Sequence, residues 1–445
     1  MTQDQFIRAL LTAAQEAGIT AAEAYYQSEE TLTVRAFEGA VDDYAVSTSG
    51  GLSLRGLVGG RMGSAYTEAL DEQAVDMLVR GVLESAALIT DEDEQFIFPG
   101  SPSYARLDAV GERGSAEEQI DFALSLEKIG KTLDPHVKRM GSYTGMQSVR
   151  ETVRIVNTYG LDVQHVQDVC IAIAMAIATR AERTMTGMEA AFARNLADLN
   201  AEKVARAAVE EAVFMLDAAP CASGTMPVIL RNGAMADLLQ TFSSVFSADA
   251  AQKGLSLLAG KEHSQIAAPC VTLVDDPLLP GGFASRPFDG EGVATYTKKV
   301  IENGVLTTLL HNLKTANKAG CASTGNASRA SYAASVGVSP TNFFLQPGQA
   351  DLDALHAHLQ NGLVVTEVSG LHAGADAVSG DFSLLSSGYL VENGRKGRPV
   401  EQITVAGNFF QLLRDIEEVG CDLRFPMGSV GSPSVRVRSL SVAGT

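Results

Sequence analysis

Residues 362–400 contain the densest group of side chains in the chain that could bind or catalyse. His372, Asp376, Ser379 and Asp381 lie among glycines, in a stretch with neither a helical nor a simple strand period. Polar side chains on a backbone bent by glycines are typical of binding loops. The same composition also forms plain turns, in which Ser and Asp side chains accept hydrogen bonds from backbone amides. We therefore treat the segment as a candidate binding loop, with a plain turn as the alternative.

The histidines and cysteines do not form a metal motif. Zinc needs imidazole, thiolate or carboxylate ligands that converge on one point, yet none of the seven histidines belongs to an H-E-x-x-H sequence. His356 and His358 lie two positions apart in a predicted helix, so they point about 200° apart and cannot share an ion. We expect both to be solvated. The five cysteines are far apart and odd in number, which argues against a disulfide framework and a C-x-x-C site.

Other catalytic sequences are absent or lie in the wrong context. The chain has no G-x-S-x-G elbow, P-loop or G-x-G-x-x-G sequence. Ser125 and Lys128 have the S-x-x-K spacing, but they lie in an amphipathic helical pattern, which indicates coincidence. The glycine-rich residues 56–64 separate two predicted strands rather than a strand and a helix, so they do not predict a phosphate-binding loop.

The elements that must position these residues begin with a helix and a set of antiparallel strands. Residues 4–17 have helical spacing, and a second helix is predicted at 72–87. Between the helices the hydrophobic period changes to two, with glycine-containing turns. This pattern predicts four strands, at residues 22–38, 41–48, 51–57 and 62–67. Proline and glycine without a period at 95–110 indicate a boundary.

The middle of the chain predicts a hairpin covered by helices. Ser115 and Glu118 have the spacing of a capping box, which predicts the start of a helix. Residues 146–157 and 161–180 predict the two arms of a long hairpin. In the second arm, alanines alternate with larger residues from Ile171 to Ala178, so one face is flat. A flat face lets a helix approach closely, and the predicted helix at 201–216 is the natural partner.

The last part of the chain is predicted to be rich in strands. A strand at 226–230 is followed by a helix to about residue 246. Two segments, 299–310 and 389–400, place Glu-Asn-Gly between apolar arms, and Asn-Gly favours the tight turn of a hairpin. Short helices are predicted at about 351–360 and 407–418.

These patterns predict an α+β fold. Its N-terminal portion would combine antiparallel sheets with packed helices, and its C-terminal domain would be rich in antiparallel hairpins. The composition shifts divide the 445 residues into three units, at 1–105, 106–220 and 221–445.

Charge and hydropathy exclude some partners. The chain has 34 basic and 53 acidic residues, a net charge of −19, which disfavours a nucleic-acid surface because phosphate binding needs basic side chains. The start has no basic segment before an apolar run, so we predict no signal peptide. The longest apolar run, Val169 to Ala178, is about half of the roughly 20 residues that span a bilayer. We expect a cytoplasmic protein that contacts neither membrane nor nucleic acid.

Several motifs resemble one known family in content and order. The sequences VSGDFS (378–383) and VENG (391–394), with Tyr389 between them, resemble the signature of the TldD/PmbA family of zinc metallopeptidase subunits, once called modulators of DNA gyrase. Further matching blocks are GLSLRGLVGGRMGSAY (51–66), FDGEGV (288–293), TKKVIENGVL (297–306), TNFFLQPG (341–348) and GSPSV (431–435). The resemblance therefore covers most of the chain.

The resemblance implies a zinc site that this sequence does not reproduce. The catalytic member of the family has H-E-x-x-x-H on the helix after the first strand of its C-terminal domain, and a cysteine near its C-terminus. The corresponding positions here are Gln240, Thr241 and Val245. Cys421 lies near the place of the family cysteine, but its spacing to residues 431–435 does not fit without a gap, and we expect a buried or incidental thiol.

This departure resembles the PmbA (TldE) branch. The resemblance implies a subunit without its own zinc, which forms a heterodimer with a zinc-bearing TldD-like chain. The heterodimer would degrade or trim unfolded or extended peptides, for precursor maturation or antitoxin removal. Such a chain could hold a peptide by strand-edge pairing. We expect five residues to line the peptide cavity: His372, Asp376, Ser379, Asp381 and Glu392.

Two alternatives remain open from the sequence. The first is a peptide-binding or regulatory homodimer without peptidase activity. The second is a self-sufficient metallopeptidase with an unorthodox site built from His372, Asp376 and Cys421.

Overall fold

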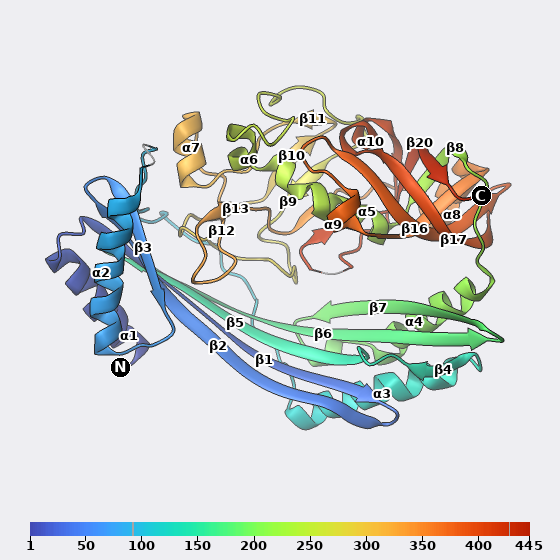
Figure 1. Cartoon of the computed structure of the whole chain (residues 1–445), viewed down its shortest axis with the longest axis horizontal. Coiled ribbons are helices and arrows are strands. Elements are labelled where there is room, and N and C mark those ends of the chain that lie inside the picture. Colours follow the sequence, from blue (N-terminus) through green and yellow to red (C-terminus); the bar gives the residue numbers. More distant parts are fainter. Residues whose placement is uncertain (91–92, 427) are drawn as a thin grey trace.

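The computed structural model describes residues 1–90, 93–426 and 428–445. One layer is a long, curved antiparallel sheet, and the C-terminal domain lies over part of it (Figure 1). Helices and mostly antiparallel sheets confirm the predicted α+β class. Within the described part of the chain, no helix is long and apolar enough to cross a membrane.

The curved sheet joins the first two units of the sequence. Its strand order is β3-β2-β1-β5-β6-β4, and β7 pairs with β6. The strands are β1 (Ala21–Phe37), β2 (Ala40–Val58), β3 (Arg61–Thr67), β4 (Val137–Met140), β5 (Gly145–Asn157), β6 (Asp162–Arg180) and β7 (Arg183–Ala193). The predicted break at residues 49–50 is wrong, because Gly50 and Gly51 stay paired with β1 inside one continuous strand.

Four helices cover this sheet: α1 (Gln3–Glu16), α2 (Glu72–Leu88), α3 (Ala116–Leu133) and α4 (Ala201–Phe214). The predicted capping box is present at the start of α3, where Ser115 and Glu118 bond each other's backbone amides. The alanine face of β6 packs against α4, and Ala174, Ala205 and Ala208 are fully buried there. The prediction that a helix would approach this face closely is therefore confirmed.

The C-terminal domain contains two main sheets, with strand orders β17-β16-β15-β8-β20-β18 and β11-β10-β9-β14-β19. The first sheet comprises β8 (Gly224–Leu230), β15 (Gly362–Ser369), β16 (Asp381–Glu392), β17 (Arg395–Asn408), β18 (Ile416–Val419) and β20 (Val435–Ala443). The second comprises β9 (Leu273–Asp275), β10 (Lys298–Glu302), β11 (Val305–Leu306), β14 (Phe343–Leu345) and β19 (Val430–Gly431). A separate pair joins β12 (Ala327–Ser328) to β13 (Gly337–Val338). Among the strand pairs of the described residues, parallel pairs occur only at β8–β15 and β14–β19.

The helices of this domain are α5 (Asn232–Phe242), α6 (Ala248–Gln252), α7 (Leu313–Ala319), α8 (Leu352–Leu359), α9 (Leu371–Gly374) and α10 (Phe409–Asp415). Single 3₁₀ turns are η1 (Leu196–Asp198), η2 (Met215–Asp217) and η3 (Ser243–Phe246). Both predicted Glu-Asn-Gly hairpins are confirmed, because Asn303 and Asn393 have positive φ angles in the turns β10–β11 and β16–β17. The predicted helix at 407–418 is too long, since residues 416–419 leave the helix to pair with β20.

A buried ionic network fixes the curved sheet to the C-terminal domain. Arg55 on β2 bonds Glu23 on β1 (2.8 Å) and Glu291 of the C-terminal domain (3.0 Å). Arg329, also from the C-terminal domain, bonds Glu23 at 2.6 Å. These side chains are almost inaccessible to solvent, and the Glu23 side chain is 0% exposed. Pairing supplies the counter-charges that buried ions need, so the two layers are firmly joined at this end.

Candidate functional site

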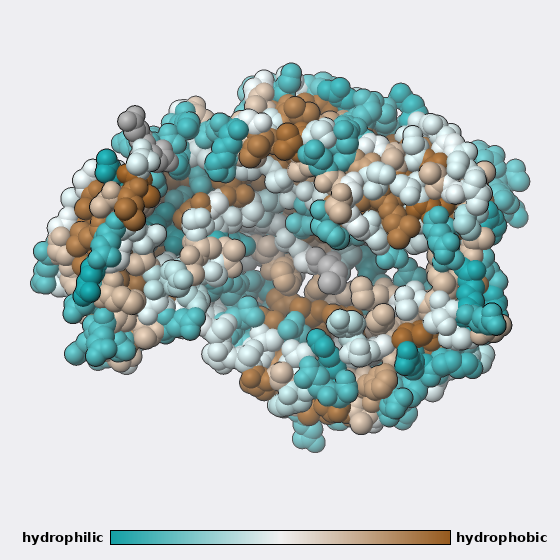
Figure 2. Space-filling view, in the orientation of Figure 1, coloured by the Kyte–Doolittle hydropathy of each residue, from teal (hydrophilic) through white to brown (hydrophobic). Residues whose placement is uncertain are grey.

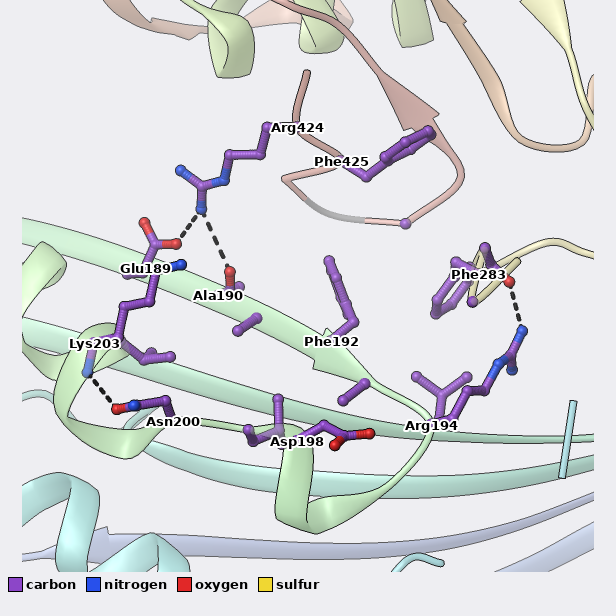
Figure 3. Close-up of a pocket in the computed structure, with 18 of the residues that line it drawn as sticks. Glu189, Ala190, Phe192, Arg194, Asp198, Asn200, Lys203, Phe283, Arg424 and Phe425 are labelled. Carbon is purple, nitrogen blue, oxygen red and sulfur yellow. Dashed lines mark hydrogen bonds and ion pairs between the residues drawn. The ribbon is translucent and has the colours of Figure 1, made fainter. Parts of the chain in front are cut away.

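A cavity of about 820 Å³ lies between β7 and the C-terminal domain. The space-filling view shows the molecule hollowed between these two parts (Figure 2). One wall comes from β7 and the start of α4, and the other comes from residues 279–283 and 422–425 (Figure 3). The volume falls within the range of ligand-binding clefts.

Strand β7 is an outer strand of the curved sheet, and side chains bond part of its free backbone edge. Arg424 donates to the Ala190 carbonyl at 3.4 Å and forms an ion pair with Glu189 (Figure 3). The Met188 amide donates to Glu211 of α4 at 3.4 Å. Because backbone groups alternate in direction along a strand, the even-numbered residues of β7 point their amides and carbonyls away from β6. This wall of the cavity is therefore a strand edge.

Aromatic rings and cations occupy the rest of the cavity wall. Phe192 on β7 contacts Phe283 edge-on, with ring centroids 5.8 Å apart. Arg194 donates to the carbonyls of Asp168 (2.7 Å) and Gly282, which holds the 279–283 loop against the sheet. Figure 3 shows Phe192 and Phe425 extending into the space between the walls. The lining combines apolar surface with a few charged groups. Ligand-binding sites of proteins commonly have this composition.

Carboxylates from both layers face one another beside this cavity. Burial raises the pKa of Glu211 to about 7, and the charge of Glu367 on β15 contributes further. Burial also raises the pKa of Asp237 on α5 to about 6, again with a contribution from Glu367. The pKa of Glu189 is raised by burial and lowered by Arg424. Glu211 of α4 and Asp237 of α5 therefore both lie close enough to Glu367 of β15 for its negative charge to raise their pKa.

The five residues predicted to line a peptide cavity lie outside this cavity, and their place in a cavity between subunits stays a prediction. Three of them form one turn: Asp376 accepts hydrogen bonds from the amides of Val378 and Ser379, and Ser379 accepts one from the amide of Asp381. His372 is exposed on α9, which precedes this turn. Glu392 is exposed at the opposite end of β16 from Asp381, about 35 Å away for an extended strand.

None of the five predicted wall residues lines the 820 Å³ cavity. The hydrogen bonds of Asp376 and Ser379 are those of the turn that the sequence offered as the alternative. The residues that do form the cavity were missed because Glu189 and Arg424 are 235 positions apart, and no local pattern connects them. Their only local signal is the alternation of strand β7 itself.

The structure confirms the expectation for His358 and contradicts it for His356. His356 is buried, and its Nε2 lies 2.9 Å from the Tyr389 hydroxyl, so the prediction of a solvated side chain is wrong for this residue. His358 is exposed and bonds Glu418. Cys421 is exposed, so of the two expected forms, a buried or an incidental thiol, the buried one is wrong.

Three family models match successive parts of the chain. They are domain 1 (residues 22–86), the central domain (residues 114–216) and the C-terminal domain (residues 223–444) of PmbA/TldA metallopeptidases. Together they cover most of the sequence in the family's order. The chain belongs to the PmbA/TldD metallopeptidase family.

Relatives of this family match along nearly the whole chain. A metalloprotease TldD homolog of Haemophilus influenzae is 25% identical, with 95% of this chain and 93% of the relative covered. Metalloprotease PmbA of Escherichia coli O157:H7 is also 25% identical, with 93% and 90% covered. A solved structure titled a putative modulator of a DNA gyrase, from Thermotoga maritima, is 34% identical with a TM-score of 0.92, covering 99% of this chain and 100% of that one. TldD and PmbA relatives match equally well, so these identities establish the family and not the branch.

The family implies zinc, but the three positions, Gln240 and Thr241 on α5 and Val245 in η3, do not fit it. The helix predicted to reach about residue 246 ends at Phe242 and continues as the 3₁₀ turn η3. Gln240 is exposed, the Thr241 hydroxyl donates to the Asp237 carbonyl at 2.8 Å, and Val245 is 1% exposed within the apolar core. A hydroxyl bonded within the helix and an aliphatic side chain are not zinc ligands. Across residues 1–90, 93–426 and 428–445, no three His, Cys, Asp or Glu side chains gather in a group that could hold a metal ion. His372, Asp376 and Cys421 therefore do not form one.

Proposed function

We propose that this chain is the non-catalytic, PmbA-type subunit of a zinc metallopeptidase that cleaves unfolded or extended peptides in the cytoplasm. The observation that carries the proposal is the set of side chains at the end of α5 and in η3, where Gln240, Thr241 and Val245 stand in place of the ligands and base expected of the catalytic member. The zinc would then be bound by a TldD-like partner chain. Maturation of peptide precursors and removal of antitoxins are the processes that such a pair would serve.

In this proposal the chain contributes peptide binding rather than chemistry. The outward backbone groups of β7 other than the Met188 amide and the Ala190 carbonyl, which Glu211 and Arg424 bond, can pair with an extended peptide regardless of its sequence. Phe192 and Phe283 offer apolar contacts beside that edge. Arg194 and Arg424 also line the cavity, and because both already bond groups of this chain, a peptide carbonyl or carboxylate would share them. A folded protein has no free strand to pair with this edge, so the cavity would select unfolded segments.

The test is to purify the chain alone and after co-expression with a TldD-like subunit. Zinc content and cleavage of a fluorogenic unfolded peptide are then measured for both preparations. We expect the chain alone to hold far less than one zinc per chain and to be inactive, and the pair to be active with one zinc that a chelator removes. Stoichiometric zinc and cleavage by the chain alone would overturn the proposal.

The same preparations separate the proposal from the regulatory alternative. If the chain binds the peptide but neither binds a TldD-like subunit nor supports cleavage, the regulatory homodimer is correct instead.

A further inference from the structure

Two guanidinium groups near the cavity have no carboxylate partner among the described residues. The first belongs to Arg194, which directly follows β7 and lines the cavity; Figure 3 shows its guanidinium beside Phe283. Arg194 donates to the carbonyls of Asp168 (2.7 Å) and Gly282 and to Oε1 of Gln167 (3.4 Å), which are all uncharged acceptors. Its Nε is buried and has no acceptor within the described structure.

The second guanidinium belongs to Arg286. Its backbone is fixed, because its amide donates to the Pro277 carbonyl at 2.9 Å and its carbonyl accepts from the Thr295 hydroxyl at 2.5 Å. Its side chain is half-buried, and no group in the described part of the chain forms a hydrogen bond or an ion pair with it. A guanidinium has five donors and no acceptor, so all five donors of Arg286 remain available to a ligand.

His165 on β6 shows that the two arginines lie close together. Burial and the positive charges of Arg286 and Arg194 lower the pKa of His165 to about 4, while Glu151 and a hydrogen bond with the Ser285 backbone act in the opposite direction. Both guanidinium groups therefore act on one uncharged imidazole ring. The Nε2 atom of this ring is also buried without a partner among the described residues.

The carboxylates nearest to these arginines are bonded to other groups. Asp168 is fully buried and pairs with Arg150 (2.8 Å) and Arg113 (3.3 Å). Glu151 accepts hydrogen bonds from two glutamine side chains, at 2.9 and 2.7 Å. The arginine pair, Arg194 and Arg286, thus carries two positive charges without an ion pair to any described residue, in a chain of net charge −19. Partly buried charges of this kind are stabilised by an added counter-ion.

We propose that the arginine pair is a subsite for a carboxylate of the peptide, which either its C-terminus or an Asp or Glu side chain supplies. The planar guanidinium group matches the two oxygens of a carboxylate. A peptide that pairs with the edge of β7 reaches Arg194 where the strand ends. Parallel pairing brings the carboxyl end of the peptide to the arginine pair, whereas antiparallel pairing brings its positive amino end, which the pair repels. The inference rests on the proposed function, because it assigns a specificity to the same cavity.

The experiment compares three matched peptides with the full chain alone. An unfolded, N-terminally labelled peptide without Asp or Glu is prepared as the free acid and as the C-terminal amide, and a third, amidated peptide contains one Glu near its C-terminus. Fluorescence anisotropy gives the Kd of each. We expect the amide to bind about tenfold more weakly than the acid, because hydrogen bonds between charged groups are lost. Recovery of affinity by the Glu peptide identifies the side chain as a second source of the carboxylate.

Variants separate recognition of charge from a structural role. Arg194→Gln and Arg286→Gln each remove one positive charge and should reduce the preference for a carboxylate to less than about threefold. Arg194→Lys keeps the charge and should retain most of the preference, although it changes the contact with Gly282. Arg180→Gln, at an exposed arginine that pairs with Asp217, is the control and should keep the full preference. If Arg194→Gln does not fold, Arg286→Gln alone decides, since its side chain bonds no described residue.

The KM values of the co-expressed pair for the same peptides should follow the same order. Equal Kd and KM values for all three peptides overturn the inference and leave the proposed function intact. A preference that survives in both Arg194→Gln and Arg286→Gln, or that is lost equally in Arg180→Gln, also overturns it. If no peptide binds to the chain and the pair cleaves none of them, the proposed function fails together with the inference.

Discussion

The ring of Phe283 contacts the ring of Phe192 edge-on, with 5.8 Å between centroids and 60° between the planes. This contact connects a loop of the C-terminal domain with strand β7 across the cavity. A peptide lying along the β7 edge would pass these rings.

Phe192→Ala should weaken peptide binding by the assembled pair. Loss of a central aromatic contact commonly costs more than 1 kcal/mol, so we expect KM for an unfolded peptide to rise about tenfold. The kcat should change little, because the residue touches no catalytic group on this chain. Steady-state kinetics of the co-expressed pair measure both constants. Tyr159→Ala, at an exposed turn residue, is the control, and an unchanged KM for Phe192→Ala would remove the cavity from the peptide path.

Arg55→Ala should strongly destabilise the fold. The substitution leaves Glu23 and Glu291 buried with fewer counter-charges, and breaking a buried ion pair costs about 3–5 kcal/mol. Urea unfolding of the chain measures the change. Arg35→Ala, which removes an exposed pair with Asp43 at 3.9 Å, should cost no more than about 1 kcal/mol. Equal losses of unfolding free energy for both variants would show that the buried ion pairs of Arg55 contribute no more than an exposed pair.

The stability of the chain should fall as pH rises from about 4.5 to 7. Burial raises the pKa of Glu211 from its usual 4.5 to about 7 in the folded chain. Between these pH values the folded chain keeps the Glu211 proton that the unfolded chain releases. The stabilising contribution of this proton is therefore complete below about pH 4.5 and is lost above about pH 7. The neighbouring groups are Glu367, Glu189 and Arg424; the carboxylates raise the pKa and the guanidinium lowers it.

Glu211→Gln isolates this contribution. The variant should be more stable than wild type at pH 8, by about 1–3 kcal/mol, and should show a flatter pH profile in urea unfolding. Its amide oxygen can still accept from the Met188 amide. Glu210→Gln, at an exposed position of the same helix, should keep the wild-type profile. Identical profiles for wild type and Glu211→Gln would show that this group does not titrate as described.

Ala174→Leu tests the flat face of β6. Ala174 is fully buried against α4, so a larger side chain must push the helix away, and overpacking costs about 1–3 kcal/mol. Thermal unfolding followed by circular dichroism measures the loss. Ile173→Leu, on the opposite face, conserves volume and should cost less than about 1.5 kcal/mol. If Ala174→Leu leaves the unfolding temperature unchanged, α4 does not pack closely against β6.

The sequence by itself determined the local elements of this fold. The capping box of Ser115 and Glu118, the alanine face of β6 and the two Asn-Gly turns all appear where their patterns predict them, because each depends on residues within a few positions of one another. The motifs between residues 51 and 435 likewise indicated the family, which the family models establish. The residue types at positions 240, 241 and 245 can also be read from the sequence, and the structure shows that Thr241 bonds within its helix and that Val245 is buried in the apolar core.

Only the tertiary structure decided where these elements meet. Glu189 and Arg424, Phe192 and Phe283, and Arg55 and Glu291 each join distant parts of the chain, and no periodicity encodes such pairs. The same is true of His356, whose burial depends on Tyr389 from another strand. The 362–400 segment looked like the site because its polar residues are close in sequence. The 820 Å³ cavity lies elsewhere, because closeness in space depends on packing between layers, which a linear pattern does not record, and a role of this segment between subunits stays a prediction.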